Sequence, residues 1–441
     1  MIEMNRLEAE NYVYASYINA EKYWKYEDPD RLKRNPIFTK KILERGSGTP
    51  TVIITGSKGK GSVSAMLSTI VGSSVKVGML TSPHIEKFNE RITICNEPIS
   101  DESLCEYIQK SKNELTPIEK NLEKGEYISP IGIQAITAQS YFNDNHTQFN
   151  IFECGKGAQY DDVTNIIHDY SIINSIFLEH TRELGPRIED IANDKKHVIS
   201  GNEKCVYSAE QESGVINVIR QYAKDKGVML KEYGKNFYSD NIRYNNGGMT
   251  FDIHVEDISI TDVTLPLLGD YQARNCALAM ALALDFLESI DLEQVKQNLS
   301  GIDWPGRFET ICSNPRVILD ACINSASCVD IIKTMKEASI NRPNIIIGIP
   351  EDKDYLGVAD AMKDHANRIL LTKTDNPHYR FSSKQKEVLQ SHGIDCKWYE
   401  NLHDALASAY EDGTDIMILG TTSLVSDVKK LQKHPHLNGP N

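Results

Sequence analysis

The sequence lacks any apolar stretch long enough to cross a membrane, any Cys-x-x-Cys pair, any internal repeat and any low-complexity tract. Its most apolar stretch, ALAMALALDFL from Ala277, is shorter than the roughly 20 residues that a membrane-spanning helix needs. The start, MIEMNRLEAENYVYASY, contains acidic residues and no apolar core, so we expect no signal peptide. These absences predict a soluble protein.

Cysteine usage and net charge indicate the compartment and the partners. The nine cysteines are odd in number and unpaired in spacing, which is typical of reduced thiols in the cytoplasm. A formal net charge of -14 disfavours nucleic acid and membrane surfaces as partners, although a local basic pocket can still bind an anion. We therefore expect a cytoplasmic protein with small-molecule ligands, present as a monomer or a small homo-oligomer.

Strand-like and helix-like segments alternate from Thr51 onward, which predicts a mostly parallel sheet with helices on both faces. Residues 1–47 are expected to form helices and a loop ahead of it. Short strands between about 203 and 265 predict a small β insertion, and the loop with DWPGRF marks a boundary near residue 300. The predicted fold class is α/β: a parallel-sheet domain over residues 1–300, with a small β insertion, then a Rossmann-like domain over 301–441.

The segment TVIITGSKGKGS, residues 51–62, predicts a strand, a tight glycine turn and the start of a helix. A standard Walker A loop has four residues between its first glycine and the Gly-Lys pair, whereas only Ser57 and Lys58 stand here. Glycine backbone at a helix N-terminus suits phosphate, Lys60 adds a positive charge and Ser62 a hydroxyl for Mg²⁺. An ordinary glycine-rich turn is the alternative, and the combined spacing favours a phosphate loop.

Polar side chains follow the next predicted strands, at the sheet edge where open α/β sheets bind ligands. Ser82 and His84 come after the second strand, Glu153 ends the third, and His180 follows the fourth. Each of them alone is typical of a turn or a solvated strand end. Together with a phosphate loop they favour a site for phosphate and a metal ion.

The order of the motifs resembles the Mur ligase superfamily, and most closely its folylpolyglutamate synthase and dihydrofolate synthase branch. The resemblance spans residues from about 36 to 430. It rests on the segments GSKGKGS, LTSPHIEKFNERI, ECGKGAQYDDVTN, FLEHTRELG, IANDKKHVISG, LLGDYQARNCALA, WPGRFE, ILDACINSA and LGTTSLVSDV. It implies an enzyme that uses ATP and Mg²⁺ to join a carboxylate to an amine, with residues 1–300 as the ATP-binding domain and 301–441 as the C-terminal ligase domain.

The resemblance also implies roles for individual residues. The phosphate loop would be Gly59, Lys60, Gly61 and Ser62, the Mg²⁺ ligands Ser82, Glu153 and His180, the ATP contacts Asn275, Arg307 and Asp320, and the carbamylated lysine Lys195, with Lys196 as the alternative position. Lys60, Lys195, His180 and Arg307 would take part in catalysis. ATP is expected between the two domains.

Three segments depart from the family pattern. The family sequence Asp-Gly-Ala-His-Asn-Pro is here Asp320 to Ser325, so Ile323 replaces a histidine. Lys58 replaces a loop asparagine, and Gly157-Ala158 replaces a glycine pair. The expected function is a ligase that activates an acid as an acyl phosphate for attack by an amino acid, glutamate first. The alternatives are a ligase for a non-folate acid and a catalytically weak nucleotide-binding homologue.

Overall fold

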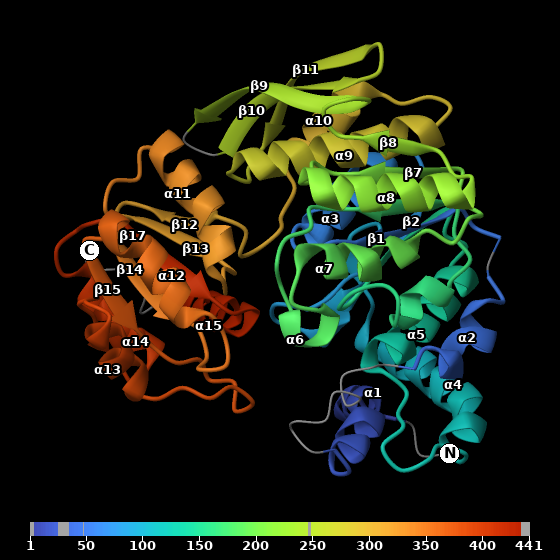
Figure 1. The fold of residues 1–441 in the computed structure, drawn as a ribbon, viewed down its shortest axis with the longest axis horizontal. Helices are drawn as coiled ribbons and strands as arrows, with labels where there is room; N and C mark the ends of the chain where they lie inside the picture. Colours follow the sequence, from blue (N-terminus) through green and yellow to red (C-terminus); the bar gives the residue numbers. More distant parts are fainter. Residues whose placement is uncertain (1–3, 25–34, 47, 246–247, 434–441) are drawn as a thin grey trace. The chain divides into compact units, whose positions relative to one another are not determined.

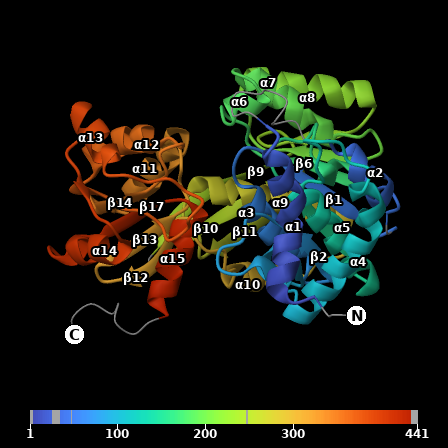
Figure 2. The ribbon, with the colours of Figure 1, turned by 90° about the horizontal axis from the view of Figure 1, so that it is seen from below.

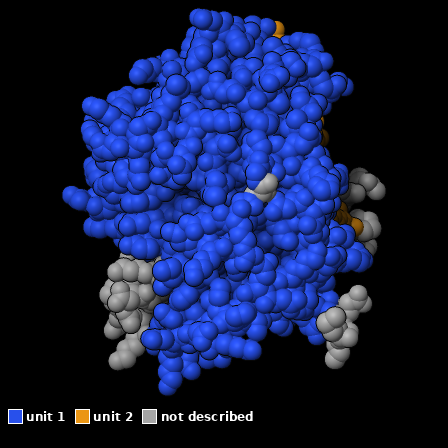
Figure 3. Space-filling model, turned by 90° about the vertical axis from the view of Figure 1, so that its right-hand side faces the viewer, with its two compact units in different colours: residues 1–240, 253–261, 274–299 blue, residues 241–252, 262–273, 300–441 orange. Residues whose placement is uncertain are grey.

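The structure is a computed structural model that describes residues 4–24, 35–46, 48–245 and 248–433. The chain divides into two compact units, drawn as a ribbon in Figure 1 and coloured separately in Figure 3. The first unit comprises residues 1–240, 253–261 and 274–299, and the second comprises 241–252, 262–273 and 300–441. The proline-containing stretch predicted as a loop lies largely outside the described residues. No described helix is long and apolar enough to span a membrane.

The first unit is built on an eight-stranded sheet with the strand order β4-β3-β2-β5-β1-β6-β7-β8. Its strands are β1 (Thr51–Thr55), β2 (Val77–Leu80), β3 (Ile92–Ile94), β4 (Glu97–Pro98), β5 (Phe149–Glu153), β6 (Tyr170–Ile173), β7 (Cys205–Ser208) and β8 (Leu230–Glu232). The neighbouring strands β2, β5, β1, β6, β7 and β8 pair in parallel. The pairs β2–β3 and β3–β4 are antiparallel. Every residue of β1 is buried, as expected for β-branched residues in a strand with helices on both sides.

The helices of this part of the chain surround the sheet. They are α1 (Arg6–Glu21), α2 (Ile37–Leu43), α3 (Lys60–Val71), α4 (Asp101–Glu119), α5 (Pro130–Asp144), α6 (Thr181–Leu184), α7 (Ile188–Lys195), α8 (Ser213–Lys226), α9 (Asp270–Phe286) and α10 (Leu292–Ser300), with 3-10 helices η2 (Phe88–Arg91), η3 (Asp162–Asn165) and η4 (Lys196–Val198). Local sequence explains their starts: Ser129 caps α5 and Pro130 fills its first position.

The predicted β insertion needs a correction. β7 and β8 join the main sheet in parallel, and α8 lies between them in sequence. A separate three-stranded sheet, in the order β11-β10-β9, holds β9 (Phe237–Asn245), β10 (Gly248–Val255) and β11 (Ile258–Leu265). The sequence interpretation failed because it took the buried strand β7 as a strand of the insertion and overlooked the amphipathic pattern of α8, whose Val215, Ile219 and Ala223 are buried.

The second unit contains a six-stranded sheet with the order β12-β13-β17-β14-β15-β16, antiparallel only between β12 and β13. Its strands are β12 (Glu309–Ser313), β13 (Arg316–Asp320), β14 (Asn344–Gly348), β15 (Arg368–Leu371), β16 (Lys397–Trp398) and β17 (Ile416–Gly420). Its helices are α11 (Cys328–Glu337), α12 (Tyr355–Met362), α13 (Lys384–Ser391), α14 (Leu402–Tyr410) and α15 (Thr422–Gln432), with η5 (Ser325–Ser327) and η6 (Lys363–His365). Figure 2 shows α11 and α12 on one face of this sheet and α14 and α15 on the other, a doubly wound arrangement.

Candidate active site

The glycine loop connects β1 to α3 and has the conformation that phosphate binding needs. Gly59 has φ 79° and immediately precedes α3. A Cβ atom at Gly59 would lie 2.5 Å from Asn174 Nδ2 and 3.1 Å from Asn275 Oδ1, so glycine is required there for space as well as for conformation. No side chain caps the first turn of α3. The backbone N–H groups at this helix start therefore suit phosphate oxygens.

Two lysines approach one carbonyl oxygen of this loop. Lys60 Nζ donates to Gly56 O at 3.0 Å, and Lys195 Nζ donates to the same oxygen at 2.9 Å. Lys195 is 1% exposed and also pairs with Glu179 at 3.1 Å. Burial lowers the pKa of Lys195, and Glu179 opposes that effect. Two amines are thus gathered where a nucleotide phosphate would bring negative charge.

The structure separates Lys195 from its alternative, Lys196. Lys196 Nζ donates to Asn193 at 2.7 Å and lies 4.9 Å from the centre of the Tyr222 ring. Only the side chain of Lys195 reaches the glycine loop through these contacts. Lys195 is therefore the lysine of this segment that belongs to the candidate site.

Ser82 and Glu153, predicted as metal ligands, lie together at the carboxyl edge of the first sheet. Glu153 ends β5, and its Oε2 accepts a hydrogen bond from the Ser82 backbone N–H at 3.1 Å. Glu153 is buried at this edge. Because Mg²⁺ prefers oxygen ligands and usually takes only one or two carboxylates, this pair fits the ion.

His180 follows β6, the fourth predicted strand, but lies further from the strand end than the sequence pattern indicated. β6 ends at Ile173, so His180 occupies the following loop, where it precedes α6 with φ 46°. Its Nε2 is 3.8 Å from Glu179 and its Nδ1 is 4.0 Å from Glu183. Burial lowers the pKa of His180 to about 4, so the ring is neutral at pH 7. Within the described ranges, no group of three or more His, Cys, Asp or Glu side chains is arranged to hold a metal.

Asn275, predicted to contact ATP, is placed beside the glycine loop by α9. Its Oδ1 accepts from Asn174 Nδ2 at 3.0 Å, and both side chains border Gly59. Asn174 directly follows β6 and was missed in the sequence, because a lone asparagine after a strand carries no spacing signal. The two amides form one wall of the loop.

In the second unit, Asp320 ends β13 and is buried, with 1% of its surface exposed. Its Oδ2 accepts from the Phe308 backbone N–H at 2.9 Å, whereas its Oδ1 has no hydrogen-bond partner among the described residues. The Nε1 of Trp304 is also buried without a partner in the described chain. Arg307 lies between these residues in sequence and donates to Gly306 O at 2.9 Å. An unsatisfied acceptor and an unsatisfied donor are features that a polar ligand can complete.

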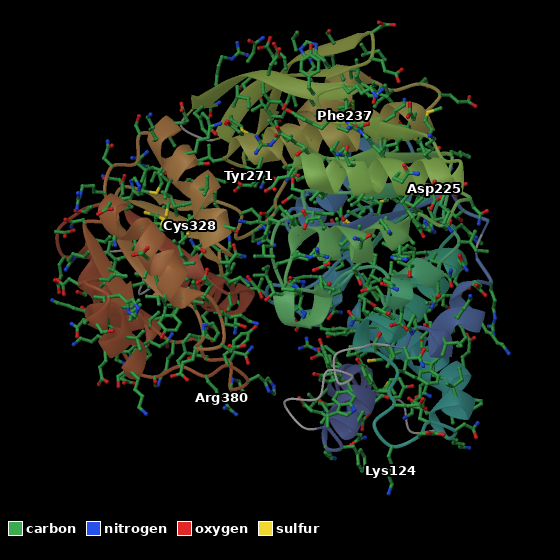
Figure 4. All side chains as sticks on the ribbon, viewed as in Figure 1. Lys124, Asp225, Phe237, Tyr271, Cys328 and Arg380 are labelled. Carbon is green, nitrogen blue, oxygen red and sulfur yellow. The ribbon has the colours of Figure 1, made fainter. Side chains whose placement is uncertain are left out.

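The loop after β13 holds Ile323, the departure from the family histidine. It is bracketed by two buried thiols, Cys322 and Cys328, whose sulfur atoms are 3.9 Å apart; Cys328 is labelled in Figure 4. Tyr271, labelled in the same view, belongs to this unit as well. Burial and the charges of Asp320 and Asp330 raise the pKa of Tyr271, and it remains a neutral phenol.

A cavity of about 400 Å³ in the first unit reaches Ser82, one of the two predicted metal ligands described above. Its lining includes Ser82 and Arg91, together with Lys156, Tyr14, Tyr17 and Tyr127. Tyr17 and Tyr127 pack edge to face at 5.4 Å, and Trp24 contacts both rings. Several lining residues, such as Ser82, Arg91 and Lys156, lie in the motif segments of the sequence, but the tyrosines come from α1 and the loop before α5, and no spacing in the sequence indicates that these segments meet.

Comparisons with known proteins agree with this geometry. A model of the Mur ligase middle domain matches residues 54–283, more than half of the 441 residues. Folylpolyglutamate synthase of Lacticaseibacillus casei is 27% identical over 86% of this chain and 88% of its own length. Dihydrofolate synthase/folylpolyglutamate synthase of Bacillus subtilis is 29% identical over 86% of this chain and 90% of its own.

A solved structure shows the same fold. Mycobacterium tuberculosis folylpolyglutamate synthase, crystallised with ADP and AMPPCP, superposes with a TM-score of 0.84 at 22% identity, covering 96% of this chain and 99% of that one. The predicted two-domain α/β fold class is thereby confirmed. The chain belongs to the Mur ligase family and is similar to its folylpolyglutamate synthase and dihydrofolate synthase members.

Proposed function

We propose that this protein is an ATP-dependent ligase that forms an amide bond between an acid and an amino acid. The observation that carries the proposal is the convergence of Lys60 and Lys195 on the glycine loop, in the unit whose cavity reaches Ser82. Phosphate-binding backbone, cations and a pocket for an organic molecule thus occur in one unit. A nucleotide-dependent activation of a bound acid uses all three.

The chemistry follows from the weakness of a carboxylate as an electrophile. The acid oxygen attacks the γ-phosphorus of ATP, ADP leaves, and the resulting acyl phosphate is attacked by the amine with loss of phosphate. Charge accumulates on the phosphoryl oxygens during transfer, so the protein mainly supplies positioned cations and N–H donors. Lys60 and the start of α3 are suited to this task in this chain.

The proposed Mg²⁺ ligands are Ser82 and Glu153, with His180 as the third. When bound, the ion neutralises charge on the phosphate oxygens and helps to orient them. The oxygen donors of Ser82 and Glu153 suit this hard cation, and the low pKa of His180 keeps its ring free to bind a metal.

Gly59, Lys60, Gly61, Ser62 and Asn275 are proposed to contact the nucleotide, and so are Arg307 and Asp320. The space reserved at Gly59 and the unsatisfied Oδ1 of Asp320 support these assignments. Arg307 would add positive charge during phosphoryl transfer. Lys195 is proposed as the lysine that takes up CO₂.

Folates and dihydropteroate are the first candidate acids, and glutamate is the first candidate amine. The names of the relatives support this choice, and the tyrosine-lined cavity offers flat apolar surface for an aromatic acid. We further propose a cytoplasmic monomer or small homo-oligomer. The nine free cysteines of the structure suit a reducing compartment.

The test is ADP release from ATP and Mg²⁺ with each acid and amino acid, added separately and together. The proposal expects release that requires both, first with a folate or dihydropteroate and glutamate. Replacing glutamate by a derivative whose amine is blocked should stop turnover, because no nucleophile would then attack the acyl phosphate. ATP binding without amine-dependent release across a panel of acids would contradict the proposal and indicate a nucleotide-binding homologue.

A further inference from the structure

Arg91 is a half-buried cation that lines the cavity of the first unit. Its Nε donates to His84 Nδ1 at 2.8 Å, and its Nη1 donates to Gln134 Oε1 at 3.0 Å. Both acceptors are neutral. Within the described part of the chain, no carboxylate lies within ion-pairing distance of the guanidinium. Burial lowers the pKa of Arg91, and Tyr14, Glu153, Glu10 and Glu90 only partly oppose that effect.

The loop that carries these groups is held in place by a carboxylate of its own. Glu90 accepts hydrogen bonds from the backbone N–H groups of Ile85 at 2.8 Å, Glu86 at 3.1 Å and Lys87 at 2.8 Å. This network fixes the turn between His84 and η2. His84 therefore meets Arg91 in a defined orientation, with its Nδ1 as acceptor and its proton on Nε2.

The guanidinium is held by two hydrogen bonds and also lines the cavity. A guanidinium has five N–H donors, and His84 and Gln134 use two of them. A third contact, the Phe88 ring at 5.1 Å from the guanidinium carbon, is apolar. Burying a positive charge beside neutral partners is unfavourable, and a carboxylate that binds through two parallel hydrogen bonds would offset that cost.

We propose that Arg91 binds a carboxylate of the acid substrate, and that His84 and Gln134 are positioning residues for it. The substrate class is then an aromatic acid whose ring packs among Tyr14, Tyr17 and Tyr127 while its carboxylate faces Arg91. This inference rests on the proposed function, because it assigns the cavity to the acid. It goes further by naming the contact that distinguishes an acid from its neutral ester.

The test measures binding without nucleotide, by calorimetry, for two matched pairs of probes: folic acid and its dimethyl ester, and 4-aminobenzoate and its methyl ester. The wild type should bind at least one acid more tightly than its ester. Arg91→Gln should lower the affinity for that acid by about tenfold or more and leave the ester within about twofold, since a hydrogen bond to a charged group is worth roughly 1.5–3 kcal/mol. Arg91→Lys keeps the charge without the planar fork and should give an intermediate loss.

Two further variants separate positioning from folding. His84→Leu removes the acceptor and should reduce the acid-to-ester ratio, whereas His84→Asn keeps an acceptor and should restore most of it. Arg45→Gln is the matched control, because Arg45 is exposed and pairs with Glu114 away from the cavity. Thermal melts of all variants show whether any loss of binding reflects unfolding.

The inference is wrong if no probe binds the wild type, if acid and ester lose affinity together in Arg91→Gln, or if neither changes. Its outcome is separable from that of the proposed function. If Arg91→Gln weakens binding of the acid but not of the ester, and no amine-dependent ADP release occurs, the proposed binding site is retained and the proposed ligase activity is rejected. If amine-dependent ADP release occurs but the ratio of acid affinity to ester affinity is unchanged in the variants, the ligase activity is retained and the proposed role of Arg91 is rejected.

Discussion

Lys60 and Lys195 share the Gly56 carbonyl oxygen, so the two amines compete for one neutral acceptor. A nucleotide phosphate offers Lys60 a better partner, because a charged hydrogen bond is about twice as strong as a neutral one. The Lys60–Gly56 contact is thus one that phosphate can replace. Lys195 has a second partner, Glu179, and can remain where it is.

Replacing Lys60 by alanine should therefore lower ATP turnover by roughly a hundredfold to a thousandfold, as loss of a charge-stabilising donor does elsewhere. The fold should persist, since Lys60 is partly exposed and its one hydrogen bond goes to a backbone carbonyl. ADP release and a thermal melt measure the two effects. Lys204→Ala, at an exposed lysine away from the loop, is the control, and near-normal turnover in Lys60→Ala would contradict the phosphate-loop assignment.

Lys195 should take up CO₂ as a carbamate. A free lysine titrates near 10.4, and only its neutral amine reacts with CO₂, so the lowered pKa of Lys195 favours the adduct. Carbon-13 NMR with labelled bicarbonate should give a carbamate signal that Lys195→Arg abolishes and Lys196→Arg retains. The assignment would be excluded if the wild-type protein gave no carbamate signal with labelled bicarbonate, or if the signal were lost only in Lys196→Arg.

How far single residues could be predicted depends on whether their signal is local. Residues 59–62 could be predicted, because glycine and lysine offsets next to a buried strand dictate backbone shape. Spacing could not decide between Lys195 and Lys196, and the burial of Lys195 supports the proposal that it is Lys195. Arg91 lies within the quoted segment LTSPHIEKFNERI, but its place in the cavity could not be predicted, since the tyrosines and Gln134 that line the cavity with it are distant in sequence.

At the scale of elements, a buried ion pair ties the loop after η3 to the start of β7. His168 Nε2 is 2.9 Å from Glu203 Oε1, and the two side chains are 2% and 0% exposed. His168 Nδ1 also meets Ile166 O at 2.7 Å, and Glu203 accepts from the Ser200 N–H at 2.6 Å. Burial lowers the pKa of His168, but Glu203 and the carbonyl oxygens outweigh it and raise the pKa overall.

This pair should give the first unit a stability maximum at mildly acid pH. The raised pKa of His168 contributes stability below its ordinary 6.5, which is lost as pH rises through the raised value. Burial opposes the ionised form of Glu203, but His168 and backbone N–H groups lower its pKa from 4.5 to about 2, so its contribution is lost as pH falls between those values. Urea unfolding midpoints should therefore be highest between about pH 4.5 and 6.5.

His168→Gln should remove the decline on the alkaline side and cost roughly 3–5 kcal/mol, since it leaves Glu203 as a buried charge without its cation. His254→Gln, at a histidine with solvent-exposed hydrogen bonds, is the control and should keep the wild-type pH profile. An unchanged alkaline decline in His168→Gln would assign the pH dependence to other groups.

The element scale also shows why the β insertion was misjudged. Short strands look alike in sequence whether they extend a parallel sheet or form a separate one, because their partners are not visible there. β7 is buried on all four residues and pairs with β6, whereas β9 has one buried residue, Phe237, followed by half-buried and exposed residues. The strand order depends on pairing between segments that are distant in sequence. Local periodicity does not reveal which strands pair.

At the scale of the whole molecule, the two units have separate apolar cores. One core gathers residues such as Ile53, Leu104 and Phe152, and the other gathers Leu268, Phe308 and Ile318. The second core thus includes a residue from before position 300. The division of the chain at 300 stays a prediction, based on one loop motif, and Leu268 bears directly on where the second unit begins.

Leu268→Ala should loosen the second unit and leave the first unchanged. Leu268 is 8% exposed within the second core, and Asp270, two residues on, bonds Tyr244 and pairs with Lys333 in the same unit. Truncating a buried leucine costs roughly 2–5 kcal/mol, so amide hydrogen exchange in β13, β14 and β17 should accelerate while β1 and β5 keep their protection. Leu104→Ala in the first core is the matched control and should give the reverse pattern. Faster exchange in both sheets of the Leu268→Ala protein would show that the two cores unfold as one, and unchanged exchange in β13 would remove Leu268 from the second unit and favour a boundary at residue 300.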